Sequence, residues 1–385
     1  MVNERLIPFG TTIFAEMTQL AEEQGAINLS QGFPDFEGPP AIIDAAEAAL
    51  RSGQNQYARS RGHPELVRAI AAARKRHYGQ AIDPLTEVVV TSGATEAIAS
   101  SMLGLLNPGD EVVLFEPTYD SYAPCVAMAG GVARYVPLRF PDFGLDPELL
   151  EVAVTDRTRM IVLNSPHNPT GKVFDTGELE VIAALARDRD LIVLSDEVYE
   201  HLLFDGAEHV PIATLPGMRE RTVTLSSTGK TFSYTGWKIG WATGPARLID
   251  AVQAAHQFVT YAVATPLQAA MARAIDDFSG DYLDTFRREY AARRDYLVGV
   301  LREVGFTVAV PRGTYFVLAS FAGLFEGDDR EFARWLTTEH RVAAIPPSAF
   351  YLAHPEEGRG LVRFAFCKKM ETLEAAAKRL RGIKR

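Results

Sequence analysis

The sequence is poor in cysteine and has no long hydrophobic run, and each absence excludes a class of protein. Only Cys125 and Cys367 occur in 385 residues, which excludes a disulfide scaffold and fits a reducing compartment. No apolar run approaches the ~18 residues that a membrane-spanning helix needs. The N-terminus places Glu4, Pro8 and Glu16 where a signal peptide would have its apolar core. We therefore expect a cytoplasmic protein without a membrane anchor.

Positive charge is also in the minority. The chain has 39 basic and 49 acidic residues, a formal net charge of -10. Nucleic acids and anionic membranes bind basic surfaces, so this balance argues against both as partners. At 47% hydrophobic residues the chain can bury large cores, and a prior of ~150 residues per domain predicts two or three domains.

What the sequence does contain is an alternation of short apolar strands and helical stretches. Helical stretches such as 95–106 and 176–187 lie between several of the strands. The expected strands are 87–90, 111–115, 160–163, 191–194, 222–225 and 239–242. Continuous apolar strands with crossover helices predict an α/β fold, in which helices cover both faces of a mostly parallel central sheet.

The pattern changes at about residue 281. A long helix is expected at 282–304, followed by three short strands and a closing helix at 372–380. This order favours a smaller α+β domain. We predict an N-terminal segment, 1–36, that packs with the small domain, a large domain, 37–285, and a small C-terminal domain, 286–385.

Five of the expected strands end in small, polar, aromatic or charged side chains. In open α/β sheets, ligands bind outside the carboxyl ends of the strands. The groups at these ends are Gly93, Ala94, Thr95, Tyr119, Asn168, Asp196, Tyr199, Ser227 and Lys230. Their convergence on one edge of the sheet predicts a binding site there.

Part of this set is suited to a flat, phosphorylated ligand. The segment 93–95 opens a helix, whose N-terminus binds phosphate through backbone N–H groups and the helix dipole. Ser227 adds a hydroxyl and Lys238 a positive charge. The ring of Tyr119 offers a face on which a heterocycle can stack.

The other part is suited to pyridoxal phosphate chemistry. Lys230 would form a Schiff base with this cofactor and, once released, carry a proton as general base. Asp196 would pair with the ring nitrogen and make the ring an electron sink. Asn168 and Tyr199 can hydrogen-bond the phenolate oxygen. The sequence therefore predicts a pyridoxal phosphate enzyme.

Simpler explanations exist for single residues. Asp196 can cap the next helix, and Asn168 stands in an Asn-Pro-Thr-Gly sequence that forms a turn on its own. Tyr119 and Tyr199, taken singly, are more typical of core packing. The two-histidine helical spacing of a zinc protease is absent around residue 200, so no metal site is expected.

At these residues the chain resembles the class I and II aminotransferases of fold type I. The motifs are Asn-Pro-Thr-Gly at 168–171, Ser-Asp-Glu-Val-Tyr at 195–199, Ser-x-x-Lys at 227–230 and Gly-Trp-Lys-Ile-Gly at 236–240. The resemblance covers nearly the whole chain. It implies transfer of the α-amino group of an L-amino acid to a 2-oxo acid through a ping-pong cycle on pyridoxal phosphate.

The resemblance implies further roles. Arg363 resembles the arginine that clamps the substrate α-carboxylate, and a bidentate fork suits that task better than lysine. Gly32 resembles the glycine whose backbone meets the same carboxylate. Tyr57 resembles the tyrosine that reaches the phosphate of a neighbouring subunit, which implies a homodimer. Phe14 and Phe33, although more typical of a core, are candidates to line an apolar substrate pocket.

The substrate is less constrained by the sequence. Lys238 stands where many members have arginine, a form similar to the branch of kynurenine, glutamine–phenylpyruvate and methionine aminotransferases. No Lys or Arg occurs between Arg247 and Arg273, which disfavours a second arginine for a dicarboxylic side chain. We therefore expect a neutral, sulfur-containing or aromatic side chain.

Two alternatives remain open. Some succinyldiaminopimelate aminotransferases resemble this chain as well, including the segment 11–17, and Arg59 and Arg61 are candidates to meet a succinyl carboxylate. A pyridoxal phosphate-dependent carbon–sulfur β-lyase would use the same site, since fold does not settle reaction. A cofactor-binding DNA regulator is disfavoured because the acidic chain has no basic helix-turn-helix extension.

Overall fold

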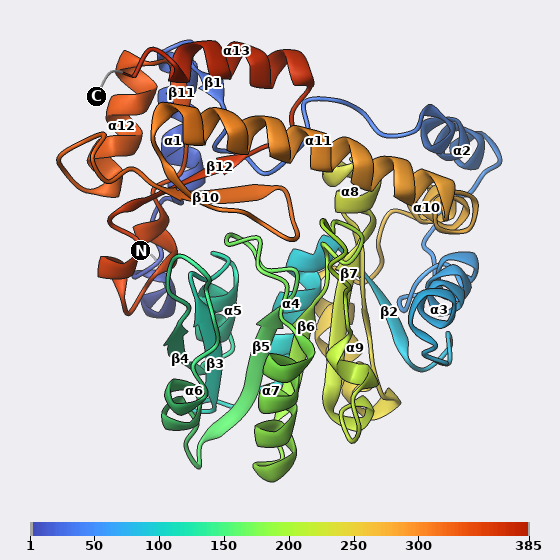
Figure 1. Ribbon diagram of the computed structural model, residues 1–385. Coiled ribbons are helices and arrows are strands. Elements are labelled where there is room, and N and C mark those ends of the chain that lie inside the picture. The colour runs from blue at the N-terminus through green and yellow to red at the C-terminus, as the bar shows by residue number, and fades with distance from the viewer. Residues whose placement is uncertain (1–2, 384–385) are drawn as a thin grey trace.

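The computed structural model describes residues 3–383, and its centre is a seven-stranded sheet (Figure 1). The strands stand in the order β2-β8-β7-β6-β5-β3-β4. Their bounds are β2 Val88–Ser92, β3 Glu111–Glu116, β4 Val132–Pro137, β5 Thr158–Asn164, β6 Ile192–Asp196, β7 Thr222–Ser227 and β8 Ile239–Thr243. The strand β8 runs antiparallel to both neighbours, and the other pairs are parallel. The predicted mostly parallel sheet is confirmed, and the strand expected at 239–242 is the reversed one.

Alternate residues of the inner strands face different layers of helices. Val112 and Leu114 of β3 pack with α4 (Gly93–Leu105), α5 (Tyr122–Met128) and α9 (Ala246–Val259). Val113 and Phe115 of the same strand pack with α6 (Pro147–Ala153) and α7 (Thr176–Asp188) on the other face. This alternation is the two-residue period of a strand, and burial on both faces explains why the strands read as unbroken apolar runs.

A third group of helices packs beside β2 and β8. It consists of α2 (Pro40–Arg51), α3 (Pro64–Tyr78) and α10 (Thr265–Asp277), whose apolar side chains cluster with Val88, Val90 and Trp241. The short helix α8, Thr228–Thr231, follows β7 directly. The sequence pattern had not predicted β4, α2, α3 or α10.

The C-terminal part has its own antiparallel sheet, in the order β12-β10-β9. Its elements are β9 Thr307–Ala309, β10 Phe316–Ser320, β11 Val342–Ala343, β12 Leu361–Ala365, α11 Asp281–Val304, α12 Asp329–Glu339 and α13 Met370–Leu380. In Figure 1, α11 crosses the molecule from this part to the neighbourhood of α10. The predicted long helix and closing helix are both present, each beginning one or two residues earlier than expected.

The N-terminal segment lies against this C-terminal part. It contains α1 (Ile13–Glu23) and β1 (Ile27–Asn28), and β1 pairs in parallel with β11. The short 3-10 helices are Glu4–Leu6, Ile212–Thr214, Arg219–Arg221, Thr235–Trp237, Pro347–Phe350 and Pro355–Glu357. The division into 1–36, 37–285 and 286–385 stays a prediction, since one apolar cluster joins Tyr199 and Leu202 to α11 and α13.

The strand ends that could form a site lie at one edge of the central sheet. The carboxyl ends of β2, β3, β5, β6 and β7 meet at one edge, and the reversal of β8 brings its amino end to the same edge. Within residues 3–383, no helix is both long and apolar enough to cross a membrane.

Candidate functional site

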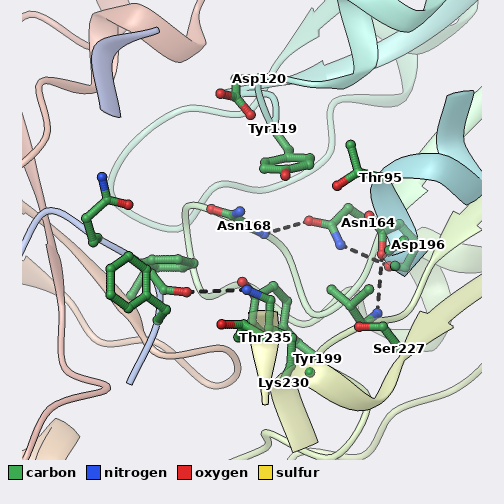
Figure 2. A pocket seen from close by; sticks show the side chains of 18 of the residues that line it. Thr95, Tyr119, Asp120, Asn164, Asn168, Asp196, Tyr199, Ser227, Lys230 and Thr235 are labelled. Atoms are coloured by element: carbon green, nitrogen blue, oxygen red, sulfur yellow. Dashed lines mark hydrogen bonds between the residues drawn. The ribbon is translucent and has the colours of Figure 1, made fainter. Parts of the chain in front are cut away.

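A cavity of about 360 Å³ lies at this edge of the sheet. In the view of Figure 2, Tyr119 stands above the cavity, Lys230 below it, and Asp196 at one side. The residues predicted for the site that line it are Phe14, Gly32, Phe33, Gly93, Ala94, Thr95, Tyr119, Asn168, Asp196, Tyr199, Ser227, Lys230, Lys238 and Arg363. The structure therefore brings together residues from both ends of the chain.

One end of the cavity collects hydrogen-bond donors around the start of α4. Gly93 has φ +71°, and a Cβ added to it would lie 3.1 Å from Cε and Nζ of Lys238, so glycine leaves room for the ammonium group. Lys238 Nζ lies 3.5 Å from Oγ1 of Thr95. Lys238 directly precedes β8, and the reversal of that strand is what places its side chain here. Backbone N–H groups, hydroxyls and an ammonium form a donor set for phosphate.

Asp196 ends β6 in the buried wall of the cavity. Burial raises the pKa of its carboxyl to about 6, although hydrogen bonds from Tyr122 and the Val198 N–H oppose that rise. The Tyr122 hydroxyl donates to Asp196 Oδ2 at 2.7 Å. This arrangement holds a carboxylate ready for a protonated ring nitrogen.

A chain of hydrogen bonds orients the residues beside Asp196. The amide of Asn164 donates to the backbone oxygen of Asp196 at 2.9 Å, and its Oδ1 accepts the N–H of Asn168 at 2.7 Å (Figure 2). Asn164 and Tyr122 were missed in the sequence. Asn164 directly follows an expected strand, and that signal could have found it, whereas Tyr122 lies inside a helix and carries no such signal.

Lys230 lies on α8 with its amine in the cavity. Its Nζ donates to Tyr315 Oη at 2.8 Å and to the Gly32 oxygen at 3.3 Å. Burial lowers the pKa of this amine to about 8, so the amine can act as a general base near neutral pH. Tyr199 lies beside it, and burial raises the pKa of its hydroxyl. Tyr315 was not predicted as a site residue.

Arg363 closes the opposite end of the cavity. Its Nη2 donates to the Ser30 oxygen at 2.7 Å and its Nη1 to Asn168 Oδ1 at 3.4 Å. The guanidinium stacks 4.2 Å from the ring centre of Phe316, and burial lowers its pKa to about 10. Its Nε is buried and has no hydrogen-bond partner among residues 3–383. A buried donor without an acceptor is costly, and a carboxylate ligand would satisfy it.

Three predicted residues lie away from the cavity of the described chain. Tyr57 is 80% exposed, and its ring stands edge-on to Tyr261 at 5.2 Å. Arg61 is ion-paired with Asp250 and donates to the Thr86 oxygen at 3.0 Å, so the expectation that it meets a substrate carboxylate finds no support. Arg59 is exposed.

The cavity fits pyridoxal phosphate in its donors and acceptors. Phosphate donors stand around Gly93 and Lys238, a buried carboxylate at Asp196, a ring face at Tyr119 and an amine at Lys230. Few other ligands need an anion site, an acceptor for a cationic ring nitrogen and a lysine of lowered pKa in one cavity.

Comparison with known proteins identifies the family. A family model described as aminotransferase class I and II matches residues 24–380. The chain belongs to the class I and II aminotransferases. This aminotransferase depends on pyridoxal phosphate and exchanges an amino group between an amino acid and a 2-oxo acid, so the predicted family, cofactor and reaction are confirmed.

Individual relatives are similar to this aminotransferase over almost its whole length. The probable N-succinyldiaminopimelate aminotransferase DapC of Mycobacterium tuberculosis is 50% identical over 99% of this chain and 98% of its own. The methionine aminotransferase of Escherichia coli is 41% identical over 100% of both. The solved structure of N-succinyldiaminopimelate aminotransferase from Mycobacterium tuberculosis superposes with a TM-score of 0.97 at 50% identity, over 100% of both chains. Such similarity confirms the fold type I architecture.

Proposed function

We propose that this aminotransferase takes its amino group from an L-amino acid with a neutral, sulfur-containing or aromatic side chain. The support is the lining of the cavity near Arg363, where Phe14, Phe33 and Phe316 supply apolar surface. The cationic side chains that line the cavity are Lys230, Lys238 and Arg363. Each has a task of its own, so among residues 3–383 no cation that lines the cavity is left for a second substrate carboxylate.

The contacts support a role for each site residue. When bound, pyridoxal phosphate supplies an electron sink that stabilises negative charge at the substrate Cα. Lys230 carries the proton removed from Cα, and burial keeps its amine partly unprotonated near neutral pH. Asp196 would accept a hydrogen bond from a protonated ring nitrogen, and the Tyr122 hydroxyl sets the orientation of that carboxylate. Arg363 binds the α-carboxylate through the Nε–H that otherwise has no acceptor among residues 3–383.

The remaining site residues bind and orient. The start of α4, Ser227 and Lys238 would hold the phosphate, and Asn168 and Tyr199 would hydrogen-bond the phenolate oxygen. Gly32 meets the α-carboxylate through its backbone: a Cβ there would lie 2.5 Å from the Phe316 ring, so only glycine fits.

The enzyme is further proposed to be a cytoplasmic homodimer in which Tyr57 completes the site of the other subunit. The support is an exposed aromatic group: Tyr57 is 80% exposed, Phe258 86% and Tyr261 52%. Exposed apolar clusters of this kind mark contact surfaces. The cytoplasmic location is supported by two free cysteines, both buried.

A second candidate substrate is a succinylated diamino acid. It is favoured by the 50% identity to the Mycobacterium tuberculosis DapC. Arg59 offers a mechanism: it is exposed, two residues from Tyr57, and would enter the other subunit's cavity together with that tyrosine. In that arrangement the second carboxylate would be bound across the dimer.

A donor panel separates the candidates. The holoenzyme is mixed with methionine, phenylalanine, kynurenine, glutamine, aspartate or succinyldiaminopimelate, and the cofactor absorbance and the released 2-oxo acid are recorded. Methionine or an aromatic donor is expected to react fastest, with Arg59→Ala unchanged. Fastest reaction with succinyldiaminopimelate, lost in Arg59→Ala, would establish the second candidate instead. Pyruvate and ammonia released without an acceptor would indicate the β-lyase, and full activity of Lys230→Ala would refute the mechanism.

A further inference from the structure

The amine of Lys230 is held by a group from the C-terminal part of the chain. Tyr315 directly precedes β10 and is buried. Its hydroxyl oxygen lies 2.8 Å from Lys230 Nζ, and the same hydroxyl donates to the Gly32 oxygen at 2.5 Å. Gly32 also accepts from Nζ at 3.3 Å. Three parts of the molecule thus meet at one amine: the N-terminal segment, the strand end of β7 and the C-terminal sheet.

The direction of these hydrogen bonds is set by the number of protons. A tyrosine hydroxyl has a single proton, and here the Gly32 carbonyl can only accept it. Toward Lys230 the hydroxyl therefore presents a lone pair, so Nζ is the donor. Burial raises the pKa of Tyr315 well above its usual value, so the phenol stays neutral. Both groups that touch Nζ are neutral acceptors, and acceptors stabilise the ammonium form of an amine.

The acceptor pair is rigid. The ring of Tyr315 stands at 88° to that of Tyr199 with centroids 5.2 Å apart, and it stacks on Tyr290 at 6.1 Å. Thr314 before it has φ +61°, a conformation that a β-branched residue adopts only when its surroundings impose it. Since no side chain other than hydrogen fits at Gly32, the carbonyl is also fixed.

We propose that Tyr315 is a positioning residue for Lys230, which holds the amine beside the Gly32 carbonyl whenever the amine is not bonded to the cofactor. In that state the lysine must receive the proton from the substrate and return it at a different atom. An amine on a flexible side chain would lose orientation during this transfer, and two fixed acceptors restrict where its protons and lone pair point. The inference rests on the proposed role of Lys230 as the proton carrier.

The test uses enzyme loaded with pyridoxamine 5′-phosphate, in which Lys230 is a free amine. Trace acetylation with acetic anhydride from about pH 6 to 10, followed by mass spectrometry of the Lys230 peptide, measures the pKa of that amine. In Tyr315→Phe we expect this pKa to fall by about one unit, a tenfold change in the protonated fraction, because the ammonium loses an acceptor. The other ionisable groups that act on the amine stay in place, and these are Asp196, Lys238, Arg363 and Cys367.

A rate measurement complements the titration. In a single turnover with methionine, Tyr315→Phe should slow amino-group transfer about tenfold or more, with little change in the methionine concentration that half-saturates the rate. Affinity is retained because Arg363 is untouched. A merely structural role of the tyrosine would not move the pKa of Lys230.

Tyr290→Phe is the matched control. It removes a buried hydroxyl from the ring that stacks on Tyr315, but the acceptors of the Lys230 amine are Tyr315 and Gly32, which both remain. Its Lys230 pKa should equal that of the wild type. An unchanged pKa in Tyr315→Phe, or an equal shift in Tyr290→Phe, overturns the proposal. If Tyr315→Phe does not fold, Tyr315→Leu has no side-chain acceptor and should show the same shift. Absence of transfer in the wild type would refute the proposed function instead.

Discussion

At the scale of single residues, the contacts of the Arg363 guanidinium are suited to binding a carboxylate. Two of its nitrogens are used by Ser30 and Asn168, and the buried Nε has no acceptor among residues 3–383. A lysine in its place keeps a charge but presents no planar fork. We predict that Arg363→Lys lowers kcat/KM about 100-fold for the amino acid and for the 2-oxo acid alike, since both carry the α-carboxylate.

Half-reaction kinetics with each substrate measure this effect. The control is Arg359→Lys, which changes an exposed arginine four residues earlier and should leave both half-reactions unchanged. A loss confined to one of the two substrates would argue against a shared carboxylate site at Arg363.

At the scale of elements, a buried ion cluster ties α3 to the turn that carries Asp196 and Tyr199. Arg74 Nη1 lies 2.8 Å from Glu197 Oε2 and 3.4 Å from Glu200 Oε2. Burial acts to raise the pKa of Glu197, but Arg74 and His209 outweigh it and hold that pKa at about 2. Asp196 and Tyr199 are thus each followed by a carboxylate, Glu197 and Glu200, that Arg74 of α3 holds in place.

Removing the arginine takes away the guanidinium that both buried carboxylates share. We predict that Arg74→Met lowers the free energy of unfolding by about 3–5 kcal/mol, and that it weakens cofactor binding because the turn of Asp196 loosens. Urea unfolding and a cofactor titration measure the two effects. Arg68→Met, on an exposed position of the same helix, should do neither. Equal stability of the two variants would show that the cluster is dispensable.

The loop after β5 contains a buried neutral imidazole. His167 contacts Thr170 Oγ1 at 2.8 Å, and burial lowers its pKa from 6.5 to about 3. Below pH 6.5 the unfolded chain therefore binds a proton that the folded chain does not, so stability falls as the pH is lowered from 6.5 toward 3.

We predict that this residue accounts for about 2 kcal/mol of the loss between roughly pH 6.5 and pH 5. In His167→Asn, which retains a polar contact to Thr170, the slope of the unfolding free energy against pH should decrease accordingly. Burial also lowers the pKa of His201, to about 4, so His201 continues to contribute to the pH dependence of stability in that variant. An unchanged slope would mean that His167 is protonated in the folded protein.

At the scale of the whole molecule, the exposed aromatic group around Tyr57 is the expected dimer contact. We predict that Phe258→Glu shifts the protein toward monomers, because a buried unpaired carboxylate opposes association. It should also weaken cofactor binding if Tyr57 completes the neighbouring site. Sedimentation velocity and a cofactor titration follow the two effects.

The control for this prediction is Val152→Glu. Val152 is 79% exposed on α6, an element that packs with a different layer of the sheet. It should leave both the mass and the cofactor affinity unchanged. A dimeric Phe258→Glu protein would place the contact elsewhere on the surface.

The sequence by itself determined the layered architecture and most of the site, because both are recorded locally. Unbroken apolar strands report burial on two faces, and polar groups that follow strands must gather at one edge of a parallel sheet. Gly93, Asp196 and Lys230 could be found in this way without knowing which strands are neighbours. The reversal of β8 could not, since an apolar run carries no mark of its direction.

Only the tertiary structure decided which distant groups touch. Tyr315 is 85 residues from Lys230, Gly32 is 198 residues from it, and Tyr122 is 74 residues from Asp196. The sequence alone suggests that Arg61 is available to a ligand, yet it is paired with Asp250, 189 residues away. Periodicity and turn chemistry act over a few residues, whereas these contacts depend on the path of the whole chain. The groups proposed to perform the chemistry could therefore be predicted from the sequence, whereas most of the groups that hold them in place could not.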